Sequence, residues 1–257
     1  MNAPDEDLTL PDRPGVAASA SPEPGTIAGG DANRPVHAIG IGPGNPDFFT
    51  RRAGDLLAEA DVVVGFETVV DYVADETDAE LLSCGYRDER EALVRFSRRV
   101  ADGAVGVAVL MGDPNHSGYQ FLGKVEAAVD GPVRVVPGIS SVQIAASRAR
   151  TPLEDSTFVT LHVRGDVTAS LDRLARDVGD RHLIVIPRPY DWMPGDVAAR
   201  LVDAGADPEL DALVLERLTH SDESVTRTDL GTLAVDAGGD GPEDSDFSDL
   251  SVLVVRN

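Results

Sequence analysis

Three short segments contain the residues best suited to bind a small molecule. They are HAIGIGPGNPDFFT at 37–50, LMGDPNHSG at 110–118 and VPGISSVQIAA at 136–146. Each follows a run of apolar, β-branched residues and precedes an expected helix. Because open α/β sheets bind ligands at the carboxyl ends of parallel strands, the three segments can meet as loops at one sheet edge. The sequence therefore predicts a small-molecule site at that edge.

The first segment has alternating glycines at 40–44, which partly match a dinucleotide-binding fingerprint. That fingerprint places its third glycine in the following helix, whose amino terminus faces a pyrophosphate. Here Pro43 and Pro46 interrupt the segment, and Thr50 is the better helix cap. We therefore expect the glycines to form a rigid turn around a ligand.

In the second segment, Gly112 and Asp113 suit a ligand that carries an ammonium or hydroxyl group. Glycine lets the backbone approach the ligand, and a carboxylate accepts hydrogen bonds from either group. The alternative is an ordinary turn that opens the next helix, since Asp is common before Pro in turns. The presence of the other two segments favours the ligand site.

Strands and helices are expected to alternate along the chain, which is typical of βαβ units and an α/β fold. The predicted strands are 36–41, 61–65, 104–110, 133–136, 157–162, 182–186, 211–216 and 250–255. The predicted helices are approximately 50–59, 88–102, 119–129, 139–149, 167–177 and 194–204.

RTPLEDS at 150–156 interrupts this alternation and predicts a domain boundary. We expect a first α/β domain at 35–152 and a second at 153–257. Residues 1–34 have no hydrophobic period and are expected to form a disordered acidic tail. DAGGDGPEDSDFSD at 236–249 is expected to be a mobile acidic loop.

The formal net charge of −23 over 257 residues argues against a nucleic-acid partner, because phosphates are neutralised by Lys and Arg. Lys124 is the only lysine, and acidic residues are in large excess. This composition is typical of a halophilic protein, in which salt screens self-repulsion.

No apolar run reaches the roughly 18 residues that a spanning helix requires, and the amino terminus lacks the apolar core of a signal peptide. We therefore expect a cytoplasmic protein with no membrane partner. A single cysteine, Cys84, excludes an intramolecular disulfide and a cysteine zinc cluster, and no metal ligands are assigned. We expect Cys84 to be a small buried residue.

GIGPGNP, MGDP and PGISS, in this order and spacing, resemble the tetrapyrrole (corrin and porphyrin) methylase family over residues 35–257. ADVVVGFETVV at 60–70, LHVRGD at 161–166 and LERLTHSDE at 215–223 look most like the cobalt-precorrin-7 C5-methyltransferases of cobalamin biosynthesis. The resemblance implies two α/β domains with the active site in the cleft between them. It also implies S-adenosylmethionine as methyl donor and S-adenosylhomocysteine as product.

The resemblance assigns cofactor contacts to matching positions in both domains. These are Pro43, Met111, Gly112, Asp113, Ser140 and Ser141 in the first domain and Ile186 and Leu218 in the second. His116 stands where relatives carry an apolar or aromatic residue, and we expect it to pack beside the cofactor.

The implied substrate is a flat macrocycle fringed with carboxylates. The resemblance assigns substrate contacts to Gly42, Asn45, His162 and Arg164. Between His162 and Arg164, Val163 stands in place of the glycine of the family's His-Gly-Arg motif. Because arginine pairs bidentately with carboxylates, the candidate arginines are Arg51, Arg52, Arg87, Arg164 and Arg188.

The implied reaction is direct displacement at the sulfonium methyl by a ring carbon, so alignment is the main requirement. We assign no catalytic base, and the Gly42, Pro43 and Gly44 loop is expected to position the reacting groups. Some relatives have an aspartate after the second strand, where this chain has Gly65-Phe66-Glu67.

Other interpretations stay open. The chain is alternatively a methylase of the same family that acts at another ring carbon or on a substrate that is not a tetrapyrrole. An alternative from a different functional class is an adenylate-binding regulatory domain. We expect a homodimer and a separate C15-methyltransferase and decarboxylase on the same pathway.

Overall fold

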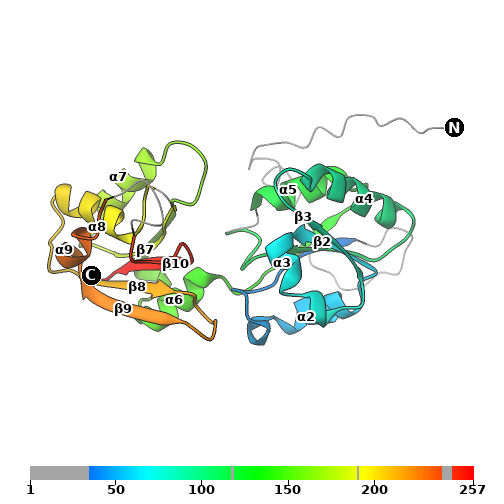
Figure 1. Ribbon diagram of the computed structural model, residues 1–257, viewed down its shortest axis with the longest axis horizontal. Helices are drawn as coiled ribbons and strands as arrows, with labels where there is room; N and C mark the ends of the chain where they lie inside the picture. The colour runs from blue at the N-terminus through cyan, green and yellow to red at the C-terminus, as the bar shows by residue number, and fades with distance from the viewer. Residues whose placement is uncertain (1–34, 117–118, 190, 239–244) are drawn as a thin grey trace. The chain divides into compact units, whose positions relative to one another are not determined.

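The computed structural model describes residues 35–116, 119–189, 191–238 and 245–257. The tail predicted at 1–34 and part of the acidic loop predicted at 236–249 lie outside these residues. The chain divides into two compact units between Ser140 and Ser141. Each unit has its own sheet and helices (Figure 1). Helix α6 (Ser141–Ala149) therefore belongs to the second unit, whereas the boundary predicted at 152–153 placed it in the first.

The first unit contains a five-stranded parallel sheet with the order β3-β2-β4-β1-β5. Its strands are β1 (Val36–Gly40), β2 (Val62–Phe66), β3 (Glu80–Cys84), β4 (Gly106–Leu110) and β5 (Val133–Val136). Its helices are α2 (Arg51–Ala58), α3 (Glu67–Asp71), α4 (Glu89–Ala101) and α5 (Tyr119–Ala128). A 3-10 turn at Pro46–Phe48 follows β1, and another at Ala74–Glu76 precedes β3.

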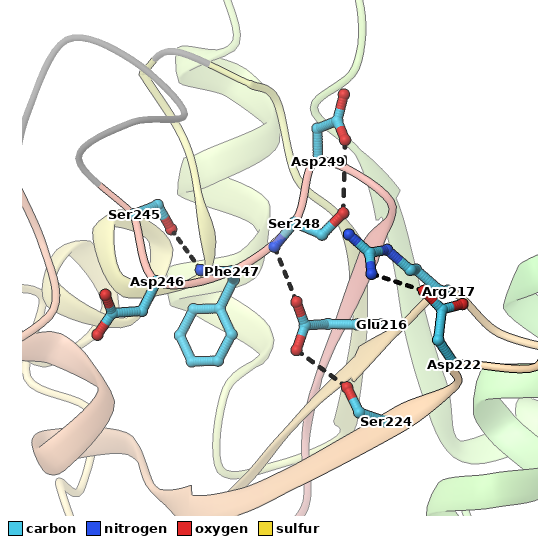
Figure 2. Close-up of a pocket in the computed structure, with 9 residues that line it drawn as sticks. All are labelled: Glu216, Arg217, Asp222, Ser224, Ser245, Asp246, Phe247, Ser248 and Asp249. Carbon is cyan, nitrogen blue, oxygen red and sulfur yellow. Dashed lines mark hydrogen bonds and ion pairs between the residues drawn. The ribbon is translucent and has the colours of Figure 1, made fainter.

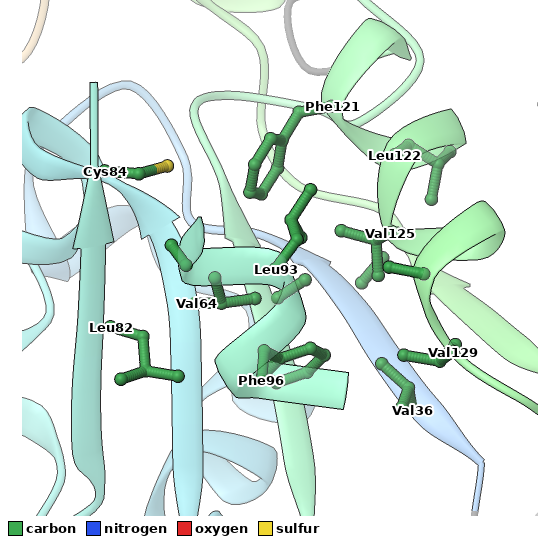
Figure 3. Packing of buried hydrophobic residues seen from close by; sticks show 14 of the residues in the cluster. Val36, Val64, Leu82, Cys84, Leu93, Phe96, Phe121, Leu122, Val125 and Val129 are labelled. Carbon is green, nitrogen blue, oxygen red and sulfur yellow. The ribbon is translucent and has the colours of Figure 1, made fainter. Parts of the chain in front are cut away.

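This sheet is covered on both faces, which explains the continuous apolar runs of its central strands. In β4, Ala108 and Leu110 pack in the cluster that includes α4 and α5, which Figure 3 shows. Val107 and Val109 alternate with them and pack in the cluster that includes α2 and α3. Helices α2 and α5 therefore cover opposite faces.

The neighbouring strands β1 and β4 form a topological switch point. From β1 the chain passes through α2 to β2, and from β4 it passes through α5 to β5 on the other side of β1. Because these helices lie on opposite faces, the chain turns toward opposite faces of the sheet beyond the loops that follow β1 and β4. The carboxyl ends of the strands at such a point are the usual ligand position in open α/β sheets.

The second unit contains a mixed sheet with the order β6-β7-β10-β8-β9, in which only β6 and β7 pair in parallel. Its strands are β6 (Ser156–Thr160), β7 (His182–Ile186), β8 (Asp211–Glu216), β9 (Ser224–Asp229) and β10 (Ser251–Val255). Its other helices are α7 (Thr168–Asp177), α8 (Pro194–Asp203), α9 (Leu230–Ala234) and the 3-10 turn Leu153–Asp155. One apolar cluster joins α7, α8 and α9 to the sheet, and α6 contacts β7 and β10 without contributing to that cluster.

All the predicted strands and helices are present with small differences at their ends, and the α/β fold class is confirmed. The strands β3 and β9 and the short helices α3 and α9 were not predicted. Cys84 is buried as expected, and burial raises the pKa of its thiol to about 12.

Candidate functional site

The three glycine-containing loops of the first unit meet at the carboxyl ends of β1 and β4. Gly42 and Gly112 exchange two backbone hydrogen bonds, with N···O distances of 3.3 and 2.7 Å. The third loop joins them through Asp113, whose Oδ2 accepts a hydrogen bond from the Gly138 amide at 3.1 Å. We call this arrangement the three-loop junction. It confirms that the loops converge as the sequence predicted.

The junction depends on backbone contacts that only glycine permits. A Cβ on Gly40 would lie 2.4 Å from the Gly112 carbonyl oxygen and 2.6 Å from the Gly138 nitrogen. A Cβ on Gly138 would lie 2.1 Å from the same oxygen. The three backbones are therefore packed directly against one another.

Asp113 holds the junction together. Its Oδ1 accepts hydrogen bonds from the Asn115 amide at 2.9 Å and the Asn115 side chain at 3.2 Å. The carboxylate thus forms the predicted turn and also reaches the third loop. A carboxylate has about four lone-pair sites, so it retains capacity to accept from a ligand.

The rest of the first loop is a rigid turn. Gly42 has φ of +79° and Gly44 of +108°, a region that favours glycine. The Asn45 side chain accepts from the Asp47 amide and caps the 3-10 turn. Thr50 caps α2 by accepting from the Ala53 amide, as predicted.

The other predicted contact residues of the first unit lie on or beside the junction. Pro43 and Met111 are half-buried, and Met111 packs against the cluster under α2. His116 is exposed, and its amide donates to the Asp113 carbonyl. Ser140, the last residue of this unit, is buried, and the predicted contact residue Ser141 begins α6 of the second unit.

In the second unit, the predicted contact residues share one edge of the sheet. Since β10 is antiparallel to both β7 and β8, the strands β6, β7 and β8 all end at this edge. Ile186 is the last residue of β7, and Leu218 lies two residues beyond β8 and is buried. His162 and Arg164 are exposed in the loop after β6.

Arg188 positions that loop within the second unit. Its guanidinium donates to the carbonyls of Val163 and Gly165 at 3.2 and 2.8 Å and pairs in a bidentate manner with Asp191. Sequence reasoning chose Arg188 as a candidate for substrate carboxylates. Its donors are instead directed to the loop that carries His162 and Arg164.

The turn after β8 has unusual backbone geometry on both sides of Leu218. Arg217 has φ of +47° and Thr219 of +73°, values uncommon for residues other than glycine. The Thr219 amide donates to Glu223 at 2.7 Å, and Glu223 accepts two hydrogen bonds from Arg148 of α6. Sequence reasoning missed this support, because positive φ at Arg or Thr has no sequence signature.

The Arg148–Glu223 pair predicts a pH dependence of stability. Hydrogen bonding to Arg148 lowers the pKa of Glu223 below its ordinary value of 4.5. A carboxyl whose pKa is lower in the folded protein than in the unfolded chain stabilises the fold when the pH is above its ordinary pKa. This contribution is lost as the pH falls below that value. The pair is partly exposed, so we expect a contribution of about 1 kcal/mol or less. Melting temperatures of Glu223→Gln and the parent should differ at neutral pH and converge in acid. A constant difference across this range would contradict the assignment.

Three of the other candidate arginines are exposed. Arg51, Arg52 and Arg87 are exposed and form no ion pair with a carboxylate in the part of the chain that the structure describes.

A pocket of about 420 Å³ lies in the second unit between the end of β8 and the segment before β10 (Figure 2). Its polar groups are largely paired with each other. Glu216 accepts from the Ser248 amide and the Ser224 hydroxyl, and Arg217 pairs with Asp222. The pocket contains none of the residues predicted to bind cofactor or substrate.

Two searches of the described residues were negative. None of the helices found there has the length and hydropathy to cross a membrane. Within the same residues, no group of three or more His, Cys, Asp and Glu side chains is placed to hold a metal ion.

Comparison with known proteins agrees on one family. Residues 35–234 match the model of the tetrapyrrole (corrin/porphyrin) methylases. The chain is 28% identical to a probable cobalt-precorrin-7 C(5)-methyltransferase of Methanocaldococcus jannaschii, covering 85% of this chain and 96% of that relative. It is 31% identical to a siroheme synthase of Gluconacetobacter diazotrophicus, covering 81% of this chain but only 48% of the relative.

A solved structure has the same fold. It is the uroporphyrin-III C-methyltransferase of Thermus thermophilus in complex with S-adenosylhomocysteine, with a TM-score of 0.64 and 23% identity. The match covers 87% of this chain and 98% of that structure.

Proposed function

Because the chain belongs to the tetrapyrrole (corrin/porphyrin) methylase family, we propose that it methylates a corrin-ring intermediate with S-adenosylmethionine. We propose cobalt-precorrin-7 as substrate and C5 as the methylated carbon, in cobalamin biosynthesis. The relative that carries this activity in its name is matched over nearly its whole length. The observation that carries the proposal is the three-loop junction at the switch point of the first sheet.

The chemistry of the junction fits S-adenosylmethionine better than a nucleotide. The three loops contain no Lys or Arg, whereas a phosphate ligand favours cationic contacts. They offer instead the Asp113 carboxylate, the Ser140 and Ser141 hydroxyls, and glycine backbone groups that no side chain covers. These groups suit a ligand with a cation, an amino acid and a ribose diol, and they disfavour the adenylate-binding alternative.

We propose that the matching residues of both units contribute to one site. Pro43, Met111 and Gly112 would approach the cofactor on the first unit, and Ile186 and Leu218 on the second. Asn45, His162 and Arg164 would contact the substrate, with His116 beside the cofactor.

When bound, S-adenosylmethionine would supply an electrophilic methyl group: a new bond from a nucleophilic ring carbon to that methyl would form as the bond from the methyl to sulfur breaks, leaving S-adenosylhomocysteine. The protein's task is to align the two molecules, which is worth about 7–11 kcal/mol for a well-positioned pair. The rigid turn at Gly42–Gly44 would hold the reacting atoms at a fixed separation. No side chain is assigned as nucleophile or base.

The position of methylation is tested by incubating the protein with S-adenosylmethionine and a set of corrin intermediates, together with uroporphyrinogen III. Mass and NMR then identify the product and the methylated carbon. A product methylated at another carbon would favour the alternative within the family, to which the similarity with a siroheme synthase points.

Asp113→Ala is expected to weaken cofactor binding by about 1–3 kcal/mol, because it removes an acceptor and releases the third loop. Titration calorimetry with S-adenosylhomocysteine measures the change. Asn115→Ala is the matched control, since it removes one donor to Asp113 but keeps both backbone donors. Unchanged affinity in Asp113→Ala would show that this loop lies away from the cofactor.

We further propose that the protein is cytoplasmic and that a separate enzyme carries out C15 methylation and decarboxylation.

We also propose that the protein is a homodimer adapted to high salt. A twofold dimer is the commonest closed assembly. With a net charge of −23, the melting temperature should rise steeply between dilute and molar KCl. A flat profile would contradict the adaptation to salt, and a monomer mass by light scattering in molar KCl would contradict the dimer.

A further inference from the structure

Tyr86 is an exposed aromatic residue that is anchored to the core of the first unit. It is 77% exposed, yet its ring centroid lies 5.1 Å from that of Phe66. The Phe66 ring lies 5.2 Å from that of Phe121, a buried residue of α5. Two successive ring contacts therefore hold the exposed ring against the protein.

The turn that carries Tyr86 is also fixed. The Gly85 amide donates to Asp88 Oδ1 at 2.7 Å, and α4 begins at the next residue, Glu89. A ring held in this way loses little conformational entropy when a ligand packs on it.

This turn lies on the same sheet edge as the three-loop junction. Phe66 and Cys84 are paired as the last residues of β2 and β3. Cys84 and Phe121 both lie toward the carboxyl ends of the strands (Figure 3). In the strand order, β3 is two positions from β4, which corresponds to about 10 Å.

The residue that follows Tyr86 in the chain is a cation, Arg87. Arg87 is exposed and forms no ion pair with a carboxylate among the residues that the structure describes. An anchored aromatic ring followed in the chain by such an arginine suits a flat, conjugated molecule that carries carboxylates at its rim.

We propose that Tyr86 stacks on one face of the substrate macrocycle while Arg87 pairs with a carboxylate at its rim. This inference rests on the proposed function and adds to it. The contact fixes the rotation of the macrocycle over the edge of the first sheet, and so selects the ring carbon presented for methylation.

The test uses uroporphyrin, a flat tetrapyrrole with carboxylates at its rim, as a probe in fluorescence titrations of the full chain. Tyr86→Ala should bind it about 10-fold more weakly, and Tyr86→Phe should bind it as the parent does. Arg87→Gln should bind it about threefold more weakly. Arg90→Gln, an exposed arginine in the first turn of α4, is the matched control and should bind as the parent.

A second titration with S-adenosylhomocysteine separates this inference from the proposed function. All four variants should keep the parent's affinity for it, because none of these residues lies in the three-loop junction. If the parent binds both molecules and Tyr86→Ala still binds uroporphyrin normally, the stacking contact is wrong and the proposed function stands. An equal loss in Tyr86→Phe would also overturn stacking, since the ring is retained. If the parent binds neither molecule, both proposals fail.

Discussion

Gly138→Ala is expected to disrupt the three-loop junction and to abolish most cofactor binding. The added methyl would lie 2.1 Å from the Gly112 carbonyl oxygen and 2.7 Å from the carbonyl carbon of Gly40. These neighbours are backbone atoms of two other loops, so they cannot turn aside as a flexible side chain would. We expect a loss of about 3 kcal/mol in the free energy of unfolding, which is the upper end of the usual range for substitutions that overpack a buried site. Urea unfolding and titration calorimetry measure the two effects.

Gly54→Ala is the matched control. A Cβ there meets nothing within 4 Å, and the residue lies inside α2. Alanine is the better helix former, so this change should stabilise the protein by about 0.5–1 kcal/mol. Gly40→Ala should behave like Gly138→Ala, since its methyl would lie 2.4 Å from the same oxygen. Parental stability and affinity in both junction variants would mean that the loops do not pack as described.

Lys124→Met is expected to destabilise the first unit by about 3–5 kcal/mol. Lys124 of α5 pairs with Glu89 at the start of α4, and their side chains are only 16% and 9% exposed. Without the ammonium group, the Glu89 carboxylate is left buried and uncompensated. Urea unfolding at neutral pH measures the loss.

The double variant Lys124→Met/Glu89→Leu separates the ion pair from packing. Replacing both partners with apolar residues should recover most of the lost stability, because the buried charge is removed as well. Arg95→Met is a control on α4, where the pair with Glu80 is exposed and should contribute little. If the double variant is as unstable as Lys124→Met, the loss of stability comes from altered side-chain packing rather than from the unpaired charge.

The convergence of the three loops was predictable, because the carboxyl ends of parallel strands must share one edge. The run before Met111 is continuous and apolar, since β4 is buried on both faces, and the runs before Gly40 and Pro137 are each interrupted by one polar residue, His37 and Arg134. Strands β3 and β9 escaped prediction for the opposite reason. SVTRTD of β9 is an exposed polar edge strand, and ELLSC of β3 buries only Leu82 and Cys84.

The functions of individual polar side chains were less predictable than their positions. Arg188 was chosen as a candidate for substrate carboxylates, but its pairing with Asp191 and two carbonyls depends on how two strands lie side by side. The same holds for Glu223, whose partners Arg148 and Thr219 lie 75 and 4 residues away. A linear sequence shows what such groups are able to bind, and tertiary structure decides which partner they meet.

The buried pairing of the only lysine also determines how the protein responds to amine-reactive reagents. Acylating agents require a neutral, accessible amine, and the Lys124 side chain is mostly covered and held by Glu89. Its acylation therefore requires α5 to move away from α4. The rate at which this single side chain is labelled would report the local opening of that helix pair, without competing signals from other lysines.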